Sequence, residues 1–141
     1  PLLDHPLIEF IGEIGDHEKP AFLGGASALL FPIDWPEPFG LVMIEAMACG
    51  TPVVAWRCGS VPEVVDDGVS GRVVDSHDEA VAAVAEVAGY DRRQVRAVFE
   101  RRFSARAMAR SYEALYARAQ PEAALPAPLR PAPAITTQQL A

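Results

Sequence analysis

Short apolar runs alternate with amphipathic stretches along most of the chain, a pattern typical of parallel strands connected by helices. Buried parallel strands are nearly continuous apolar runs, whereas surface helices carry apolar residues three or four positions apart. Strands are predicted at residues 7–14, 28–32, 53–55 and 72–74. Helices are predicted at residues 18–25, 41–49, 59–65 (a helix or a turn), 76–89, 91–99 and 104–118.

This order predicts an α/β domain built on a doubly wound, Rossmann-like parallel sheet of about four strands, with helices on both faces. Such a domain usually carries five or more strands, so the sheet is expected to lack its first strands. A chain of 141 residues has room for one domain, expected here over residues 1–119. Residues 120–141 are rich in Pro, Ala, Gln and Thr without periodicity, which predicts a disordered tail.

Polar residues mark the predicted helix ends. Ser76 and Glu79 match a capping box, and Ser104 is placed to cap the last helix. Gly50 follows the apolar segment 41–49, as expected of a glycine that ends a buried helix.

The charge balance and the few cysteines and histidines exclude some functions. Twelve basic and nineteen acidic residues give a net charge of −7, which argues against binding to nucleic acid. The two cysteines and three histidines show no metal-ligand spacing. No apolar run is long enough to span a bilayer and none resembles a signal peptide, so we expect a cytoplasmic protein.

The most informative segment is the loop after the second predicted strand. Glu37 lies there between Pro36 and Pro38, at the carboxyl end of a parallel strand, where open α/β sheets place their ligands. A carboxylate accepts two sugar hydroxyl groups with charge-assisted strength. Glu45 lies on the following helix among apolar neighbours, and a buried glutamate needs a ligand or a hydrogen-bond donor.

The start of that helix suits a phosphate. Phe39, Gly40 and Leu41 lie at the helix N-terminus, where free backbone amides and the positive end of the dipole attract anions. Gly40 lets a ligand approach the backbone closely. Two acids suited to bind sugar hydroxyls, Glu37 and Glu45, therefore lie on either side of backbone amides suited to bind a phosphate.

Glu37 and Glu45 reproduce a Glu-x7-Glu motif with Pro38 to Leu41 inside it. This motif resembles that of family 4 retaining glycosyltransferases of the GT-B fold. Phe10-Ile11-Gly12 is similar to the family's strand and turn near the nucleotide base, and the segments 45–55 and 59–63 are similar to its core segments. The likeness covers roughly residues 7 to 118.

The resemblance implies a donor site in the C-terminal domain of such an enzyme. Glu37 would be the catalytic residue that contacts the transferred sugar, and Glu45 would bind the ribose hydroxyls. The reaction would transfer a glycosyl group from a nucleotide diphosphate sugar with retention, without a bound metal ion or another cofactor. The residues implied to bind the donor are Ile11, Gly12, Phe39, Gly40, Leu41 and Glu45.

The chain also departs from the family pattern. It lacks the opening strand and Gly-rich turn, the Arg and Lys that pair with the diphosphate, and the N-terminal domain that binds the carbohydrate, lipid or small-molecule acceptor. We therefore expect a C-terminal fragment that is inactive alone. A sugar-nucleotide epimerase of the same fold and a non-catalytic nucleotide-binding or interaction module remain alternatives.

Two partner surfaces are left open by the sequence. The arginines at 92, 93, 101, 102 and 106 could contact an anionic membrane surface, although solvated helix faces explain them better. A sheet edge exposed by truncation could pair two chains as a homodimer.

Overall fold

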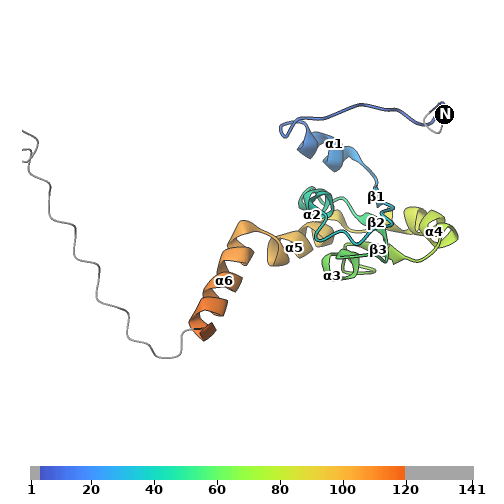
Figure 1. The fold of residues 1–141 in the computed structure, drawn as a ribbon. Helices are drawn as coiled ribbons and strands as arrows, with labels where there is room; N and C mark the ends of the chain where they lie inside the picture. The colour runs from blue at the N-terminus through green and yellow to red at the C-terminus, as the bar shows by residue number, and fades with distance from the viewer. Residues whose placement is uncertain (1–3, 120–141) are drawn as a thin grey trace, which may run out of the picture. The chain divides into compact units, whose positions relative to one another are not determined.

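The computed structural model describes residues 4–119, which contain a small parallel sheet and several helices (Figure 1). The strands are β1 (Leu29–Phe31), β2 (Val53–Trp56) and β3 (Gly71–Val74). The helices are α1 (Lys19–Gly25), α2 (Leu41–Ala48), α3 (Val61–Val64), α4 (His77–Val87), α5 (Arg92–Arg102) and α6 (Ala105–Ala119). The chain divides into two units, residues 1–108 and residues 109–141, and residues 109–119 of the second unit are helical.

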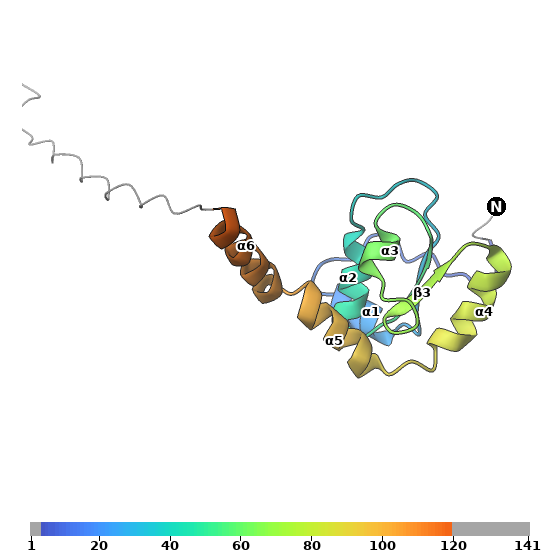
Figure 2. The ribbon, with the colours of Figure 1, turned by 90° about the horizontal axis from the view of Figure 1, so that it is seen from below.

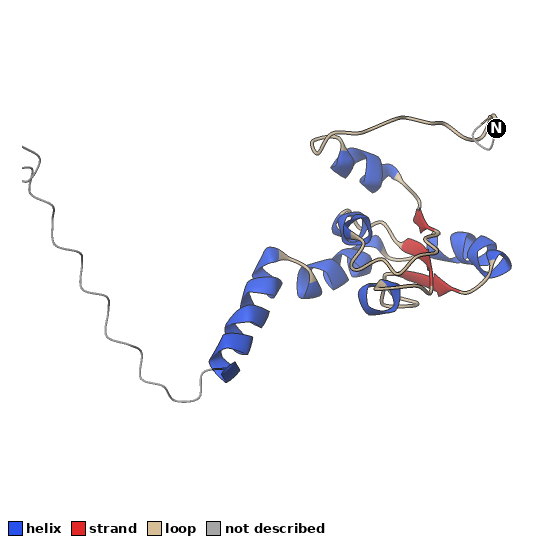
Figure 3. Ribbon diagram, in the orientation of Figure 1, coloured by secondary structure: helices blue, strands red, loops and turns tan. Residues whose placement is uncertain are grey.

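The three strands are parallel and lie in the order β1-β2-β3 (Figure 3). Leu29 pairs with Val53, and Val53 pairs with Gly71, so the three strands begin at one level. The loops after the strands therefore all leave the sheet at the carboxyl ends of the strands, where ligands of open α/β sheets bind.

Helices cover both faces of the sheet, as predicted. Val53, Ala55 and Val73 point to one face, where they form the larger apolar core with α2, α3 and α5. Val54 and Val74 alternate to the other face and pack against α4. Figures 1 and 2 show α4 on one side of the strands and α2 and α5 on the other.

The strand predicted at residues 7–14 is wrong, and the sheet has three described strands in place of about four. Residues 4–13 are exposed, and Leu7 and Phe10 keep 88% and 79% of their surface accessible. A strand exists only through hydrogen bonds to a neighbour, and within residues 4–119 no strand flanks β1 opposite β2. The alternating apolar pattern of residues 7–14 therefore has no neighbouring strand with which to pair.

The predicted helix ends are confirmed. The Ser76 hydroxyl accepts a hydrogen bond from the Glu79 N–H at 3.2 Å, and the Ser104 hydroxyl accepts one from the Ala107 N–H at 3.2 Å. Gly50 follows α2 with a φ of +73°, which a glycine adopts easily. Helix α5 extends to Arg102, beyond its predicted end at residue 99.

Each helix among residues 4–119 is too short or too polar to span a bilayer. The predicted tail at residues 120–141 lies outside the described residues, and the domain boundary at residue 119 stays a prediction.

Candidate functional site

Glu37 lies in the loop between β1 and α2, half-buried, with its carboxylate turned back to the start of α2. Its Oε1 accepts a hydrogen bond from the Gly40 N–H at 3.2 Å. The N–H groups of Leu41 and Val42, which come next, have no acceptor among the described residues. The N-terminus of α2 therefore presents two backbone amides without an acceptor. They lie beside the Glu37 carboxylate, which already accepts a hydrogen bond from the Gly40 amide.

Gly40 is required by the backbone. Its φ is +72°, in the left-handed region, and a Cβ there would lie 2.6 Å from Cε of Met43 and 3.4 Å from the ring of Phe31. The reason for glycine is therefore this turn and its packing, in addition to the ligand approach that the sequence suggested.

The residues on either side of Gly40 are exposed. The Phe39 ring packs edge-on against the Phe103 ring, with centroids 6.2 Å apart and an interplanar angle of 78°. Leu41 keeps 65% of its surface accessible. Phe39 thus fixes the loop to the end of α5, whereas the Leu41 side chain is available for contact.

Glu45 differs from the expectation of a buried acid, because its side chain is 38% accessible. It lies on the second turn of α2, and its Oε1 accepts a hydrogen bond from Nζ of Lys19 on α1 at 3.3 Å. Lys19 also forms an ion pair with Asp16 at 3.0 Å. The hydrogen bonds to Asp16 and then to Glu45 raise the pKa of Lys19 above its ordinary value of 10.5.

A cavity of about 300 Å³ adjoins Glu45. Its polar wall is formed by Asp16, Lys19 and Glu45, and its apolar wall comes from α1 and the end of α2. Lys19 and Asp16 were not predicted from the sequence, because nothing local marks a lysine on one helix as the partner of an acid 26 residues away.

Ile11 and Gly12 are not brought to either acid by any described contact. Both lie in the exposed segment before α1, and a Cβ on Gly12 would have no heavy atom within 4 Å. Their assignment to the nucleotide base stays a prediction, as do the roles of the other donor residues.

Several arginines between residues 92 and 106 are engaged within the fold, Arg92 and Arg102 among them. The Arg92 guanidinium donates to the Gly24 and Ala26 carbonyls at 2.7 and 2.8 Å. Arg102 donates to the Glu63 carbonyl and pairs with Asp66. These contacts give Arg92 and Arg102 a structural role in place of the solvated helix faces that were expected for them, and the membrane contact stays a prediction.

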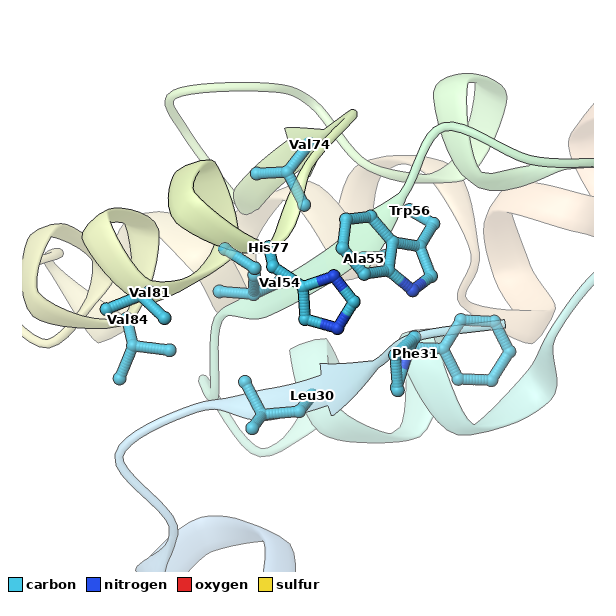
Figure 4. A pocket seen from close by; sticks show the side chains of 11 residues that line it. Leu30, Phe31, Val54, Ala55, Trp56, Val74, His77, Val81 and Val84 are labelled. Atoms are coloured by element: carbon cyan, nitrogen blue, oxygen red, sulfur yellow. The ribbon is translucent and has the colours of Figure 1, made fainter. Parts of the chain in front are cut away.

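A second hollow, of about 190 Å³, lies between α4 and the edge of the sheet (Figure 4). Leu30, Val54 and Val81 line it, and the His77 ring lies tilted by 60° against the Trp56 ring, with ring centroids 5.2 Å apart. Its walls are almost entirely apolar, so it offers no groups that select a phosphate or a sugar. Among residues 4–119 no group of three or more His, Cys, Asp or Glu side chains could hold a metal ion.

The parallel strand order and the helix N-terminus that follows β1 define an open α/β domain, and comparison with known proteins identifies the family. Residues 5–97, well over half of the chain, match the model of "Glycosyl transferases group 1". The chain therefore belongs to this family of glycosyltransferases, and the resemblance found in the sequence is confirmed.

Relatives and solved structures agree with the family. The D-inositol 3-phosphate glycosyltransferase of Corynebacterium kroppenstedtii is 41% identical over 80 residues, which are 57% of this chain and 18% of that protein. Its namesake from Saccharomonospora viridis is 55% identical over 67 residues, 46% of this chain and 15% of that protein. The chain thus spans less than a fifth of the length of these relatives.

Among solved structures, AviGT4, a glycosyltransferase involved in avilamycin A biosynthesis, has a TM-score of 0.64 and 30% identity over 79% of this chain and 36% of its own. Anabaena Alr3699/HepE in complex with UDP-glucose has a TM-score of 0.62 and 25% identity over 78% of this chain and 32% of its own. The likeness to these two structures confirms the predicted fold class.

Proposed function

We propose that this chain forms part of the donor site of a retaining glycosyltransferase, which transfers a glycosyl group from a nucleotide diphosphate sugar to an acceptor. The observation that carries the proposal is the Glu37 carboxylate at the N-terminus of α2, beside the free amides of Leu41 and Val42. These groups combine hydrogen-bond acceptors for a sugar with donors for a phosphate.

The diphosphate would bind at the N-terminus of α2. The amides of Leu41 and Val42 would donate to its oxygens, and the positive end of the helix dipole favours their charge. Charge builds on the diphosphate as it leaves the sugar, so the same amides would stabilise the transition state more than the ground state. Glu37 would accept hydrogen bonds from sugar hydroxyls, with the Gly40 N–H holding one of its oxygens.

The ribose would bind at Glu45. Lys19 donates to Oε1 of Glu45, and no described residue donates a hydrogen bond to Oε2. One oxygen is therefore free to accept a ribose hydroxyl while the ion pair is kept. The adjoining cavity of about 300 Å³ has room for part of a nucleoside.

We propose a nucleotide sugar as the donor substrate, without a resident metal ion or other cofactor. The structure of Alr3699/HepE with UDP-glucose supports this class of donor. The acceptor would bind to parts of a longer protein, and we propose that the 141-residue chain alone has no transferase turnover. Detection of glycosyl transfer by this chain would contradict that last point.

Calorimetric titration of the chain with UDP, GDP and ADP tests the proposal. Glu45→Gln should weaken nucleotide binding by about 1.5 to 3 kcal/mol, or about 10- to 150-fold, because it removes a hydrogen bond to a charged group. Glu113→Gln is the matched control, since Glu113 lies on an exposed part of α6. Unchanged binding by Glu45→Gln would show that the ribose assignment is wrong.

Glu37→Ala should behave differently. It should reduce the affinity for a nucleotide sugar and spare that for the free nucleoside diphosphate, because only the sugar contacts Glu37 in the proposal. A parent chain that binds none of the three nucleotides would contradict the donor-site proposal as a whole.

A further inference from the structure

Two loops meet closely at Glu37. The loop after β2 places Gly59, with a φ of +53°, against the loop after β1. A Cβ on Gly59 would lie 2.5 Å from both N and O of Glu37 and 2.9 Å from C of Pro36. These are backbone atoms, so no side-chain rotation can relieve the contact.

Hydrogen bonds join the same two loops. The Ser60 N–H donates to the Glu37 carbonyl at 3.0 Å, and the Glu37 N–H donates to the Trp35 carbonyl at 2.7 Å. The carboxylate of Glu37 is held in turn by the Gly40 N–H. The backbone and the side chain of Glu37 are therefore each fixed, and the backbone is fixed by the loop that Gly59 permits.

We propose that Gly59 is a positioning residue for Glu37: its missing side chain lets the loop after β2 lie directly on the Glu37 peptide and set where the carboxylate stands. This inference rests on the proposed function for its consequence in sugar binding. The geometric part, a coupling of Gly59 to the Glu37–Gly40 hydrogen bond, does not depend on any ligand.

The expected displacement follows from the contact distances. Ordinary van der Waals contact of a Cβ begins at 3.4 Å, so an alanine at position 59, 2.5 Å from the Glu37 backbone, must push the loops apart by most of an ångström. Misplacement of about 1 Å in an active site can cost roughly 100-fold in rate, and a hydrogen bond of 3.2 Å has little length to spare.

The test compares Gly59→Ala with Gly68→Ala. Both glycines have positive φ, +53° and +78°, but a Cβ on Gly68 would have no heavy atom within 4 Å. The control therefore also places an alanine at a positive φ, but without the collision. Gly59→Ala should lose about tenfold or more in affinity for UDP-glucose while keeping its affinity for UDP within about twofold. Gly68→Ala should keep both affinities.

Two further measurements separate positioning from general damage. In the double variant with Glu37→Ala, Gly59→Ala should cost no further sugar affinity, because both changes remove one contact. Without ligand, the NMR shift and the exchange rate of the Gly40 amide should change in Gly59→Ala as they do in Glu37→Ala, and stay at parent values in Gly68→Ala.

The outcomes distinguish the two proposals. A Gly59→Ala variant with the parent's Gly40 amide signal and the parent's preference for UDP-glucose over UDP would overturn the inference. If the parent shows no such preference but the Gly40 amide still responds to Gly59→Ala alone, the donor-site proposal fails and the positioning inference stands.

A second variant covers the case in which Gly59→Ala does not fold. Ser60→Pro removes the N–H that donates to the Glu37 carbonyl, and the Ser60 φ of −76° already suits proline. It should shift the Gly40 amide in the same direction as Glu37→Ala. An unchanged Gly40 amide in a folded Ser60→Pro chain would also count against the inference.

Discussion

Arg92 connects helix α1 to the rest of the fold, and its replacement by methionine tests how α1 is held. Its guanidinium donates to the carbonyls of Gly24 and Ala26 and to the Thr51 hydroxyl, at 2.7, 2.8 and 2.7 Å. Methionine keeps much of the apolar stem and removes the charged donors. Since α1 carries Lys19, this contact also supports the partner of Glu45.

The magnitude follows from three hydrogen bonds. Bonds to charged groups contribute about 1.5–3 kcal/mol each when well buried, and the partial exposure of Arg92 lowers this to about 1 kcal/mol each. Arg92→Met should thus reduce the free energy of unfolding by about 2–4 kcal/mol, a large part of the 5–15 kcal/mol typical of a domain. At about 4–8 °C per kcal/mol, Tm should fall by roughly 8–32 °C.

Thermal unfolding followed by circular dichroism, with urea unfolding as a second measurement, gives both quantities. Arg93→Met is the matched control, because the neighbouring Arg93 is exposed and its side chain forms no hydrogen bond or ion pair with a described residue. A Tm for Arg92→Met within about 3 °C of that control corresponds to less than 1 kcal/mol and would refute the assigned role.

Two further predictions concern the same helix. Thr51→Val removes a buried hydroxyl that donates to the Leu23 carbonyl at 2.6 Å, so urea unfolding should show a loss of about 1–3 kcal/mol, less than additive with Arg92→Met. Lys19 has a pKa raised by its two carboxylate partners, so its stabilising contribution is complete below pH 10.5 and is lost as the pH rises through the folded-state pKa. The stability difference between parent and Lys19→Met should thus be constant from about pH 6 to 9 and shrink above 10.5; a difference that grows there would contradict this.

The sequence predicted most elements of the fold because their signals are local. The run at residues 53–55 is apolar on both faces of its strand, and the pair Ser76 and Glu79 closes its own hydrogen bond at the start of α4. The segment 7–14 carries an equally clear local pattern and forms no strand. A segment forms a strand only when a neighbouring strand pairs with it, and the sequence of the segment does not encode that neighbour.

The candidate site likewise has features that local sequence predicts and features that depend on how distant segments pack. The spacing of Glu37 and Glu45 and the glycine between them could be found from the sequence alone. The contact of Glu45 with Lys19 could not, because it depends on how α1 packs against α2. The close approach of Gly59 to Glu37 depends on adjacent loops of parallel strands and was equally hidden.

The two acids of the motif are supported by different kinds of contact, and this difference has a consequence for binding. Glu37 is fixed by backbone hydrogen bonds from its own loop and the next, which salt screens little. Glu45 is held by a lysine ammonium in an exposed ion pair, which salt weakens. In the proposed site, selection of the sugar should therefore depend on loop geometry and change little with ionic strength. The position of the ribose-binding carboxylate should depend on charge, so raised salt should loosen Glu45 before it affects Glu37.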